Sequence, residues 1–358
     1  MLGKRRYSPR HDTDDRVRRR IRPATKQTDN CGNREECRSV AVYRLEGTQW
    51  PRGRLSQHAG PGGAADPRGG YRRRRATQQP GAPLIDLLFH ELESPWAIEV
   101  IRGVERVARD QGVGVVLSEC INLQTPDKSW TDAVLARRPI GVILVFSDLS
   151  STQRAQLRSR QIPFVVVDPV GDPLPDVPSV GSANWSGGLS ATRHLIKLGH
   201  RRIAVIGGPS HVLCVRARID GYRTALNHAG IPVDEALMRH GDFHTEAGRR
   251  LAHELLGLPD PPTAIFAGND LQALGVYEAA REMGLRIPED ISVVGYDDLP
   301  LARWVGPPLT TVRQPLVEMA EEATRMVLAL SRGIEPPNRR LDLATSLVVR
   351  ASTQAPRA

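Results

Sequence analysis

The sequence predicts an α/β protein with two doubly wound lobes, each built on a parallel sheet, after a basic N-terminal segment. Three observations predict this architecture. From Leu84 onward, short apolar runs alternate with amphipathic stretches, a pattern typical of doubly wound folds. The apolar runs are nearly continuous, as in parallel strands that helices cover on both faces. A Pro- and Asp-rich break at residues 168–178 (DPVGDPLPDVP) divides these units into two series, where a crossover between lobes fits.

The first series opens with a strand at residues 84–89 and an amphipathic helix at 95–111. Pro95 suits the first helical turn, and Gly112 follows the helix end. The later elements alternate in the same way, with strands at 113–117, 141–146 and 164–167 and helices at 129–136 and 153–160. The period of their apolar residues assigns each element to strand or helix. We expect these units to form the first lobe.

The second series repeats the pattern, with helices at 185–198, 215–229, 246–256 and 271–283 and strands at 203–206, 264–267 and 291–296. We expect the first lobe to comprise residues 81–175 and about 314–340. The second lobe would comprise residues 176–313 and about 341–358. Loops at the carboxyl ends of the strands would then face a cleft between the lobes, where ligands bind in folds of this kind.

The positive charge is concentrated in residues 1–80, which hold 20 Lys and Arg against eight Asp and Glu, a net charge of +12. The whole chain carries +9, so residues 81–358 sum to −3. The basic segment is rich in Arg, Gly and Pro, and such a composition buries too little apolar surface to offset chain entropy. We therefore expect residues 1–80 to be disordered, with an anionic partner such as nucleic acid.

The four cysteines, Cys31, Cys37, Cys120 and Cys214, are too few and too scattered for a disulfide framework or a zinc site. We expect reduced thiols and neither a metal nor a cofactor. No apolar stretch approaches the roughly 18–20 residues of a membrane span. The first 30 residues are charged throughout, without the apolar core of a signal peptide. These features predict a cytoplasmic protein.

Four motifs resemble the effector-binding core of lac-repressor-type (LacI/GalR family) transcription regulators. They are residues 191–208 (ATRHLIKLGHRRIAVIGG), 267–275 (AGNDLQALG), 287–298 (IPEDISVVGYDD) and 308–314 (PLTTVRQ). They occur in the order and spacing of that family, and the resemblance spans about residues 83–353. It implies a dimer of two-lobed, periplasmic-binding-protein-like cores. Lobe closure on a sugar-like effector would alter operator DNA binding by an N-terminal helix-turn-helix, so the expected function is transcriptional repression.

The resemblance also implies roles for single residues. Asp297, in the GYDD turn, matches the carboxylate that accepts hydrogen bonds from sugar hydroxyls. Arg218 matches the arginine that donates to the effector, and Asn269 matches a polar contact at its turn. Phe243 matches an aromatic position against the ligand. The remaining implied positions are a polar residue at the first crossover, Asp168, and two approximate matches in the first lobe, Ser94 and Trp96.

The chemistry of these side chains suits a polyol. A carboxylate accepts from two neighbouring hydroxyls, a guanidinium donates two parallel bonds, and an aromatic ring covers the apolar C–H face of a sugar. Each residue also has a structural alternative. Asp297 and Asn269 can cap the following turn or helix, and Arg218 can be a solvated helix charge. For Phe243 and Trp96 the alternative is packing in the core, and His90 and His194 can be packed or exposed histidines rather than ligands.

The family's helix-turn-helix head has no counterpart in residues 1–80. That segment offers no pair of amphipathic helices joined by a short turn, so no DNA-reading residue is assigned. Residues 70–75 (GYRRRR) resemble the end of the family's head, whereas everything before Gly69 is unrelated. Abundant Arg, Gly and Pro with almost no Lys is typical of a GC-rich coding region in a wrong reading frame. We hypothesise a frameshift near Gly69, which sequencing of the locus would test.

Three classes of function compete. The first is the LacI-type regulator, and the second is a small-molecule binding protein that lacks specific DNA binding. The third is an α/β enzyme, which we do not expect because the sequence holds no nucleophile elbow, no Walker-type phosphate loop and no His-Glu-x-x-His motif. By family analogy, the helix at 95–109 and the segment 270–281 are expected dimer surfaces. The sequence leaves the identity of the effector open.

Overall fold

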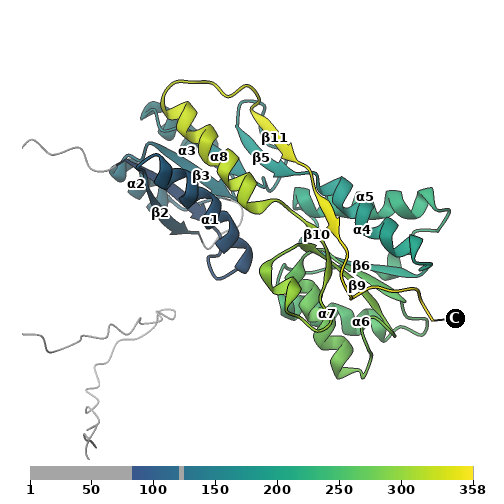
Figure 1. Cartoon of the computed structure of the whole chain (residues 1–358). Coiled ribbons are helices and arrows are strands. Elements are labelled where there is room, and N and C mark those ends of the chain that lie inside the picture. Colours follow the sequence, from purple (N-terminus) through teal and green to yellow (C-terminus); the bar gives the residue numbers. More distant parts are fainter. Residues whose placement is uncertain (1–82, 121–124, 358) are drawn as a thin grey trace, which may run out of the picture. The chain divides into compact units, whose positions relative to one another are not determined.

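Two mostly parallel sheets, each with six strands, carry the fold of the part of the chain that the structure describes (Figure 1). The structure is a computed structural model, and it describes residues 83–120 and 125–357. The basic segment, with Cys31, Cys37 and the proposed frameshift, lies outside these residues. Within them, no helix is both long and apolar enough to cross a membrane.

The first sheet has the strand order β11-β5-β4-β3-β1-β2, and all of its neighbouring strands are parallel. Its strands are β1 (Leu84–Phe89), β2 (Gly114–Glu119), β3 (Gly141–Val145), β4 (Phe164–Val167), β5 (Ser179–Ser182) and β11 (Arg340–Leu343). Four helices flank it: α1 (Pro95–Asp110), α2 (Lys128–Arg137), α3 (Ser151–Ser159) and α8 (Leu316–Ser331). We call this sheet with its helices the first lobe.

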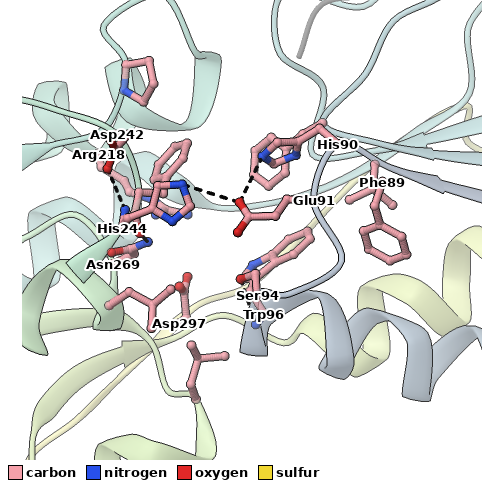
Figure 2. A pocket seen from close by; sticks show the side chains of 16 residues that line it. Phe89, His90, Glu91, Ser94, Trp96, Arg218, Asp242, His244, Asn269 and Asp297 are labelled. Carbon is pink, nitrogen blue, oxygen red and sulfur yellow. Dashed lines mark hydrogen bonds and ion pairs between the residues drawn. The ribbon is translucent and has the colours of Figure 1, made fainter. Parts of the chain in front are cut away.

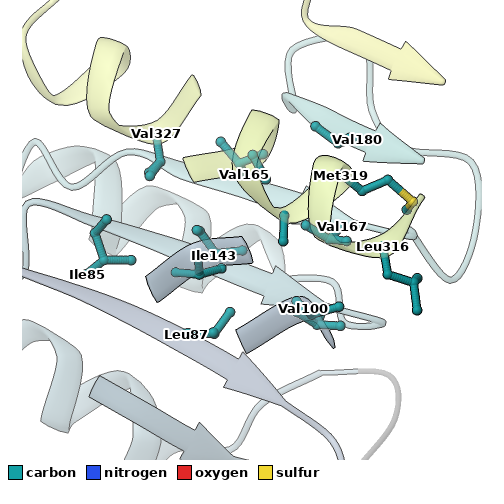
Figure 3. Close-up of a cluster of buried hydrophobic side chains, with 14 of the residues drawn as sticks. Ile85, Leu87, Val100, Ile143, Val165, Val167, Val180, Leu316, Met319 and Val327 are labelled. Carbon is teal, nitrogen blue, oxygen red and sulfur yellow. The ribbon is translucent and has the colours of Figure 1, made fainter. Parts of the chain in front are cut away.

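Continuous apolar strands form here because helices cover both faces of the sheet. Along β3, Ile143 and Val145 pack in the cluster with α1 and α8, whereas Val142 and Leu144 pack in the cluster with α2 and α3. All five residues of β3 are buried. Figure 3 shows the first of these clusters, which includes Ile85, Leu87, Val100, Ile143, Val165, Val167, Val180, Leu316, Met319 and Val327. The alternation of side chains along a strand therefore serves two cores.

The second sheet has the order β12-β10-β9-β8-β6-β7, with β12 antiparallel to β10. Its strands are β6 (Ile203–Gly207), β7 (Met238–His240), β8 (Ala264–Ala267), β9 (Ser292–Asp297), β10 (Thr310–Arg313) and β12 (Ser346–Val348). One face packs against α4 (Asn184–Lys197) and α5 (Leu213–His228), and the other against α6 (Thr245–Leu256) and α7 (Asp270–Glu282). We call this sheet with its helices the second lobe.

The chain passes between the lobes three times. It enters the second lobe after β5, returns after β10 at Gln314, and leaves again after β11. The sequence pattern placed residues 176–182 in the second lobe, but β5 pairs with β4 in the first sheet. It also placed residues 341–343 in the second lobe, whereas β11 pairs with β5. Both strands are short and contain Ser, Gly or charged residues, so neither gives the apolar run that marks the other strands.

The fold class predicted from the sequence is confirmed. The bounds of β1, β4 and β8 match the predicted strands, and the predicted helices agree with α1 to α7 within two residues. The sequence did not predict six elements individually, namely the strands β5, β7, β10, β11 and β12 and the helix α8.

The tight crossing of the helices α4 and α5 was also not predicted from the sequence and is seen only in the structure. A Cβ on Gly188 would lie 2.1 Å from the backbone oxygen of Arg218, so glycine permits this approach.

Candidate functional site

A pocket lies between the two lobes, at the carboxyl ends of strands from both sheets (Figure 2). It holds about 810 Å³ of space, part of it open to solvent, which suits a small organic ligand. The first lobe contributes Phe89, His90, Glu91, Ser94, Trp96, Val145 and Phe146 to its lining. The second lobe contributes Pro209, Arg218, Asp242, Phe243, His244, Asn269, Leu271, Asp297 and Leu299. We refer to it as the interlobe pocket.

Three residues at strand ends near this pocket have a left-handed backbone. Phe146, Asp168 and Asp297 follow or end β3, β4 and β9, with φ angles of 49°, 48° and 112°. Such angles are uncommon for residues other than glycine and cost of order 1–3 kcal/mol each. Strain of this kind concentrates at ligand sites. The turns that end these strands are therefore candidates for a binding function.

Asp297 ends β9 and is 5% exposed. Its carboxylate lines the interlobe pocket and accepts no hydrogen bond from any residue that the structure describes. Burial raises its pKa well above the ordinary value, while the positive charge of Arg218 opposes that rise. A buried carboxylate without donors is costly. Hydroxyl donors of a ligand would satisfy it, and they would favour the charged form.

Arg218 comes from α5, and its guanidinium is buried. Its Nε donates to Asn184 Oδ1 at 2.8 Å, one Nη donates to the carbonyl of Gly268 at 2.6 Å, and the other donates to Gln314 Oε1 at 3.2 Å. The guanidinium carbon lies 3.7 Å from the ring centre of Tyr296. Since a guanidinium has five N–H groups, two of them have no acceptor among the described residues.

Asn269 is both a helix cap and part of the pocket lining. Its Oδ1 accepts the backbone N–H of Gln272 at 2.7 Å and thereby caps α7. Its Nδ2 donates to the carbonyl of Phe243 at 2.9 Å, which holds the loop between β7 and α6 in place. Asn269 therefore caps a helix, the structural alternative to ligand binding at this position. One further N–H of the side-chain amide is left for a ligand.

Aromatic rings from both lobes meet in the pocket. Trp96 at the start of α1 lies 5.0 Å from the ring centre of Phe146, which lies 6.0 Å from that of Phe243 in the second lobe. Gly208 lets the Phe243 ring approach, because a Cβ there would lie 2.4 Å from a ring carbon. These rings offer an apolar surface to a flat or puckered ligand ring.

Ser94 and Asp168 differ in their relation to the pocket. Ser94 lines it and caps α1, because its Oγ accepts the backbone N–H of Trp96 at 3.3 Å. Asp168 does not line it. Instead, Asp168 is 2% exposed behind the pocket, lines a separate cavity beside β5 and β11, and accepts a hydrogen bond from Gln314. The structure therefore brings six of the seven implied residues together and places Asp168 apart.

Several pocket residues were not selected from the sequence. His90 and Glu91 follow β1, and Asp242 and His244 flank Phe243 in the loop after β7. Glu91 Oε2 lies 3.9 Å from His90 Nε2 and 3.5 Å from His244 Nε2, so these side chains face one another across the lobes (Figure 2). For His90 and Glu91, the position directly after the predicted strand at residues 84–89 was the available signal, whereas the strand before Asp242 and His244, β7, was not predicted. The sequence does not show which loops of the two lobes face each other, because that depends on how the lobes pack together.

Burial also affects the carboxylate of Asp168, outside the interlobe pocket. It raises the pKa of Asp168 to about 6, and the charge of Arg218 and the hydrogen bond from Gln314 limit the rise. Burial likewise raises the pKa of Tyr296, beneath Arg218, to about 12. In the described part of the chain, no three His, Cys, Asp or Glu residues are grouped so as to hold a metal ion. The donors present suit hydrogen bonding to a polar organic molecule.

The fold and the pocket define a class: a periplasmic-binding-protein-like core of two α/β lobes with a ligand pocket between them. The family model of the periplasmic binding protein-like domain matches residues 192–353. The chain is 33% identical over 271 residues to the HTH-type transcriptional repressor CytR of Escherichia coli K12, which covers 76% of this chain and 79% of that repressor. The chain belongs to the LacI/GalR family of transcription regulators.

Other relatives agree. The HTH-type transcriptional repressor PurR of Escherichia coli O139:H28 is 35% identical over 246 residues, covering 68% of this chain and 72% of PurR. The transcriptional regulator CelR–cellobiose complex has a TM-score of 0.68 at 33% identity, covering 75% of this chain and 84% of CelR. A LacI family regulator from Enterococcus faecium with bound ribose has a TM-score of 0.69 at 27% identity, covering 76% of this chain and 100% of that regulator. These relatives are transcription regulators rather than enzymes.

Proposed function

We propose that the chain is a DNA-binding transcriptional repressor whose interlobe pocket binds a sugar-like effector. The observation that carries this proposal is that Asp297 and Arg218 line the same pocket. The carboxylate has no donor among the described residues, and the guanidinium keeps two N–H groups unused. Acceptors and donors that stay unmatched inside a buried site favour a ligand that offers both, as adjacent hydroxyls do.

The aromatic side chains support the same class of ligand. Trp96 and Phe243 come from opposite lobes and line one pocket, where they would cover the C–H faces of a sugar ring. Two similar structures hold a sugar, cellobiose in one and ribose in the other. We propose Asp297, Arg218, Asn269, Phe243, Trp96 and Ser94 as the effector-binding residues. For Asp168 we propose an indirect role from behind the pocket.

The proposal extends to operator DNA, by kinship with the repressors CytR and PurR. Action on operator DNA would place the protein in the cytoplasm. We also propose a homodimer that uses α1 and residues 270–281, and the side chain of Ile98 on α1 is 54% exposed.

A second candidate function is that of a small-molecule binding protein without specific DNA binding. The observation that favours it is the lack of a recognisable helix-turn-helix pattern in residues 1–80.

Calorimetric titration of the full chain with ribose, cellobiose and glucose tests the effector proposal. We expect at least one compound to bind with a dissociation constant in the micromolar range. In Asp297→Asn, affinity should fall at least ten-fold, because the amide repels one of the two hydroxyl donors. Asp220→Asn, an exposed site on the same helix as Arg218, is the matched control and should bind normally. Equal affinity in Asp297→Asn and the control would refute the assignment of this site.

A further inference from the structure

Gln314 lies where the chain returns from the second lobe to the first, and it contacts three of the implied site residues. It is 3% exposed. Its Nε2 donates to Asp168 Oδ2 at 2.7 Å, and its Oε1 accepts from Arg218 Nη2 at 3.2 Å. Its backbone N–H donates to the carbonyl of Asp297 at 3.2 Å. Gln314 itself does not line the interlobe pocket.

The chemistry of the two partners fixes the orientation of the Gln314 amide. A carboxylate only accepts and a guanidinium only donates, so the amide nitrogen must face Asp168 and the amide oxygen must face Arg218. Because Asp168 belongs to the first lobe and Arg218 to the second, the amide connects the lobes at a buried position. In the described residues, Arg218 has no carboxylate within salt-bridge distance, so this amide is the hydrogen-bonded link between the two charges.

We propose that Gln314 is a positioning residue: it holds Arg218 ready for the effector and ties the pocket to the first lobe through Asp168. This inference rests on the proposed function of the pocket. If the lobes shift relative to each other, one of the two side-chain hydrogen bonds must lengthen or break. A ligand that fixes Arg218 therefore favours the lobe arrangement in which both bonds are kept, which is how binding biases a conformational equilibrium.

Several charged or titratable groups influence Asp168 and bear on the test. Arg218 from α5 lowers its pKa, and Asp342 from β11 raises it. Asp297, Cys214 and Tyr296 also interact with it electrostatically. The Gln314 hydrogen bond favours the charged carboxylate. The contribution of Gln314 to stability should thus grow as Asp168 ionises near pH 6.

The test compares Gln314→Met with Gln153→Met in the full chain. Methionine keeps the approximate volume and removes both hydrogen bonds. Gln153 is a matched control because it is also buried and its amide donates twice, to the carbonyl of Pro126 and to Thr131 Oγ1, both within the first lobe. By hydrogen exchange, Gln314→Met should speed exchange at the end of β4 and around Arg218 in α5. Gln153→Met should speed exchange in the first lobe alone.

The pH profile separates a positioning role from simple packing. At pH 7.5, Gln314→Met should lower the unfolding midpoint by roughly 4–8 °C, the loss of one or two charge-assisted hydrogen bonds. At pH 5.0, where Asp168 is protonated, the loss should be less than half as large. Gln153→Met should show the same loss at both pH values. A pH-independent loss in Gln314→Met, or exchange that changes in one lobe only, would overturn the proposal.

Neither measurement requires a ligand. Failure of every compound to bind in calorimetry would therefore count against the proposed effector, while the link through Gln314 would still be judged by hydrogen exchange and by the pH dependence of stability.

Should Gln314→Met fail to fold, the variant Gln314→Glu gives a second test. It keeps the acceptor for Arg218 and places a like charge beside Asp168, so its destabilisation should also be larger at pH 7.5 than at pH 5.0. Equal destabilisation at both values would contradict the inference.

Discussion

At the scale of single residues, the site depends on ionisable groups held in buried positions. Asp297 faces the pocket without a protein donor, Arg218 is held by three hydrogen bonds, and Asp168 lies behind both. The family resemblance located Asp297 and Arg218, and Asp297 also stands at a fixed place in the motif at residues 287–298. The resemblance did not reveal Gln314 as the connection between Arg218 and Asp168, because that contact joins residues 146 positions apart.

Asp168 should give the protein a pH-dependent stability. Its pKa in the folded chain is about 6, above the ordinary 3.8, so the unfolded chain releases this proton first as the pH rises. The contribution of Asp168 to stability is therefore present below pH 4 and is lost between about pH 4 and pH 6. The loss is about 3 kcal/mol. Asn tolerates the left-handed backbone at this position, so Asp168→Asn is the suitable variant.

Urea unfolding of both proteins at several pH values measures this effect. Relative to the wild type, Asp168→Asn should gain about 3 kcal/mol of unfolding free energy between pH 4 and pH 7. Asp132→Asn, at an exposed position on α2, controls for general charge effects and should show no such gain. Parallel pH curves for the wild type and Asp168→Asn would show that Asp168 does not titrate in this window.

Arg218→Lys should be far from conservative. A lysine ammonium cannot reproduce the planar fork that reaches Asn184, Gly268 and Gln314 together. We expect unfolding free energy to fall by roughly 2–4 kcal/mol and the affinity for the effector to fall at least ten-fold. Arg223→Lys, an arginine on the same helix that pairs with Glu235 near the surface, should change neither quantity measurably. Normal effector affinity in Arg218→Lys would contradict the proposed role of the guanidinium.

At the scale of elements, sequence patterns predicted those units whose burial is uniform. Strands such as β3 and β8 are apolar throughout because helices cover both faces, and their runs stand out. The strand β5 is also fully buried, yet its residues SVGS gave no apolar run. Its small side chains lie at the first crossover, where Asp342 from β11 approaches within 2.8 Å of a Cβ built on Gly181. Local composition there reflects close packing between segments distant in sequence.

The crossing of α4 and α5 positions Arg218 and can be tested directly. Gly188→Ala would place a methyl group 2.1 Å from the backbone oxygen of Arg218, so the helices must separate. We expect a loss of about 1–3 kcal/mol in unfolding free energy, together with weaker effector binding. Gly171→Ala has no atom within 4 Å of the added carbon and should be close to neutral. Similar stability of the two variants in thermal unfolding would argue against a packing constraint at this crossing.

At the scale of the whole molecule, the function depends on how the lobes meet. The alternating strands and helices and the break at residues 168–178 predicted two lobes and a cleft, since parallel strands present their carboxyl ends to one side. The pairing of His90 and Glu91 with His244, and the placing of Phe146 against Phe243, followed only from the structure. Both sets join loops of different lobes. The periodicity of apolar residues within one strand or helix carries no information about which loop of the other lobe that element will face.

The measurement that tests the central claim most directly is fluorescence anisotropy of the full chain with labelled DNA from its own upstream region. An unrelated duplex is titrated beside it over a salt series, with and without the compound that binds in calorimetry. We predict a preference for the upstream DNA that persists at physiological salt and changes when the effector is added. Equal binding to both duplexes that disappears as salt rises, with no response to the effector, would contradict the repressor assignment. That result would instead support a small-molecule binding protein without specific DNA binding.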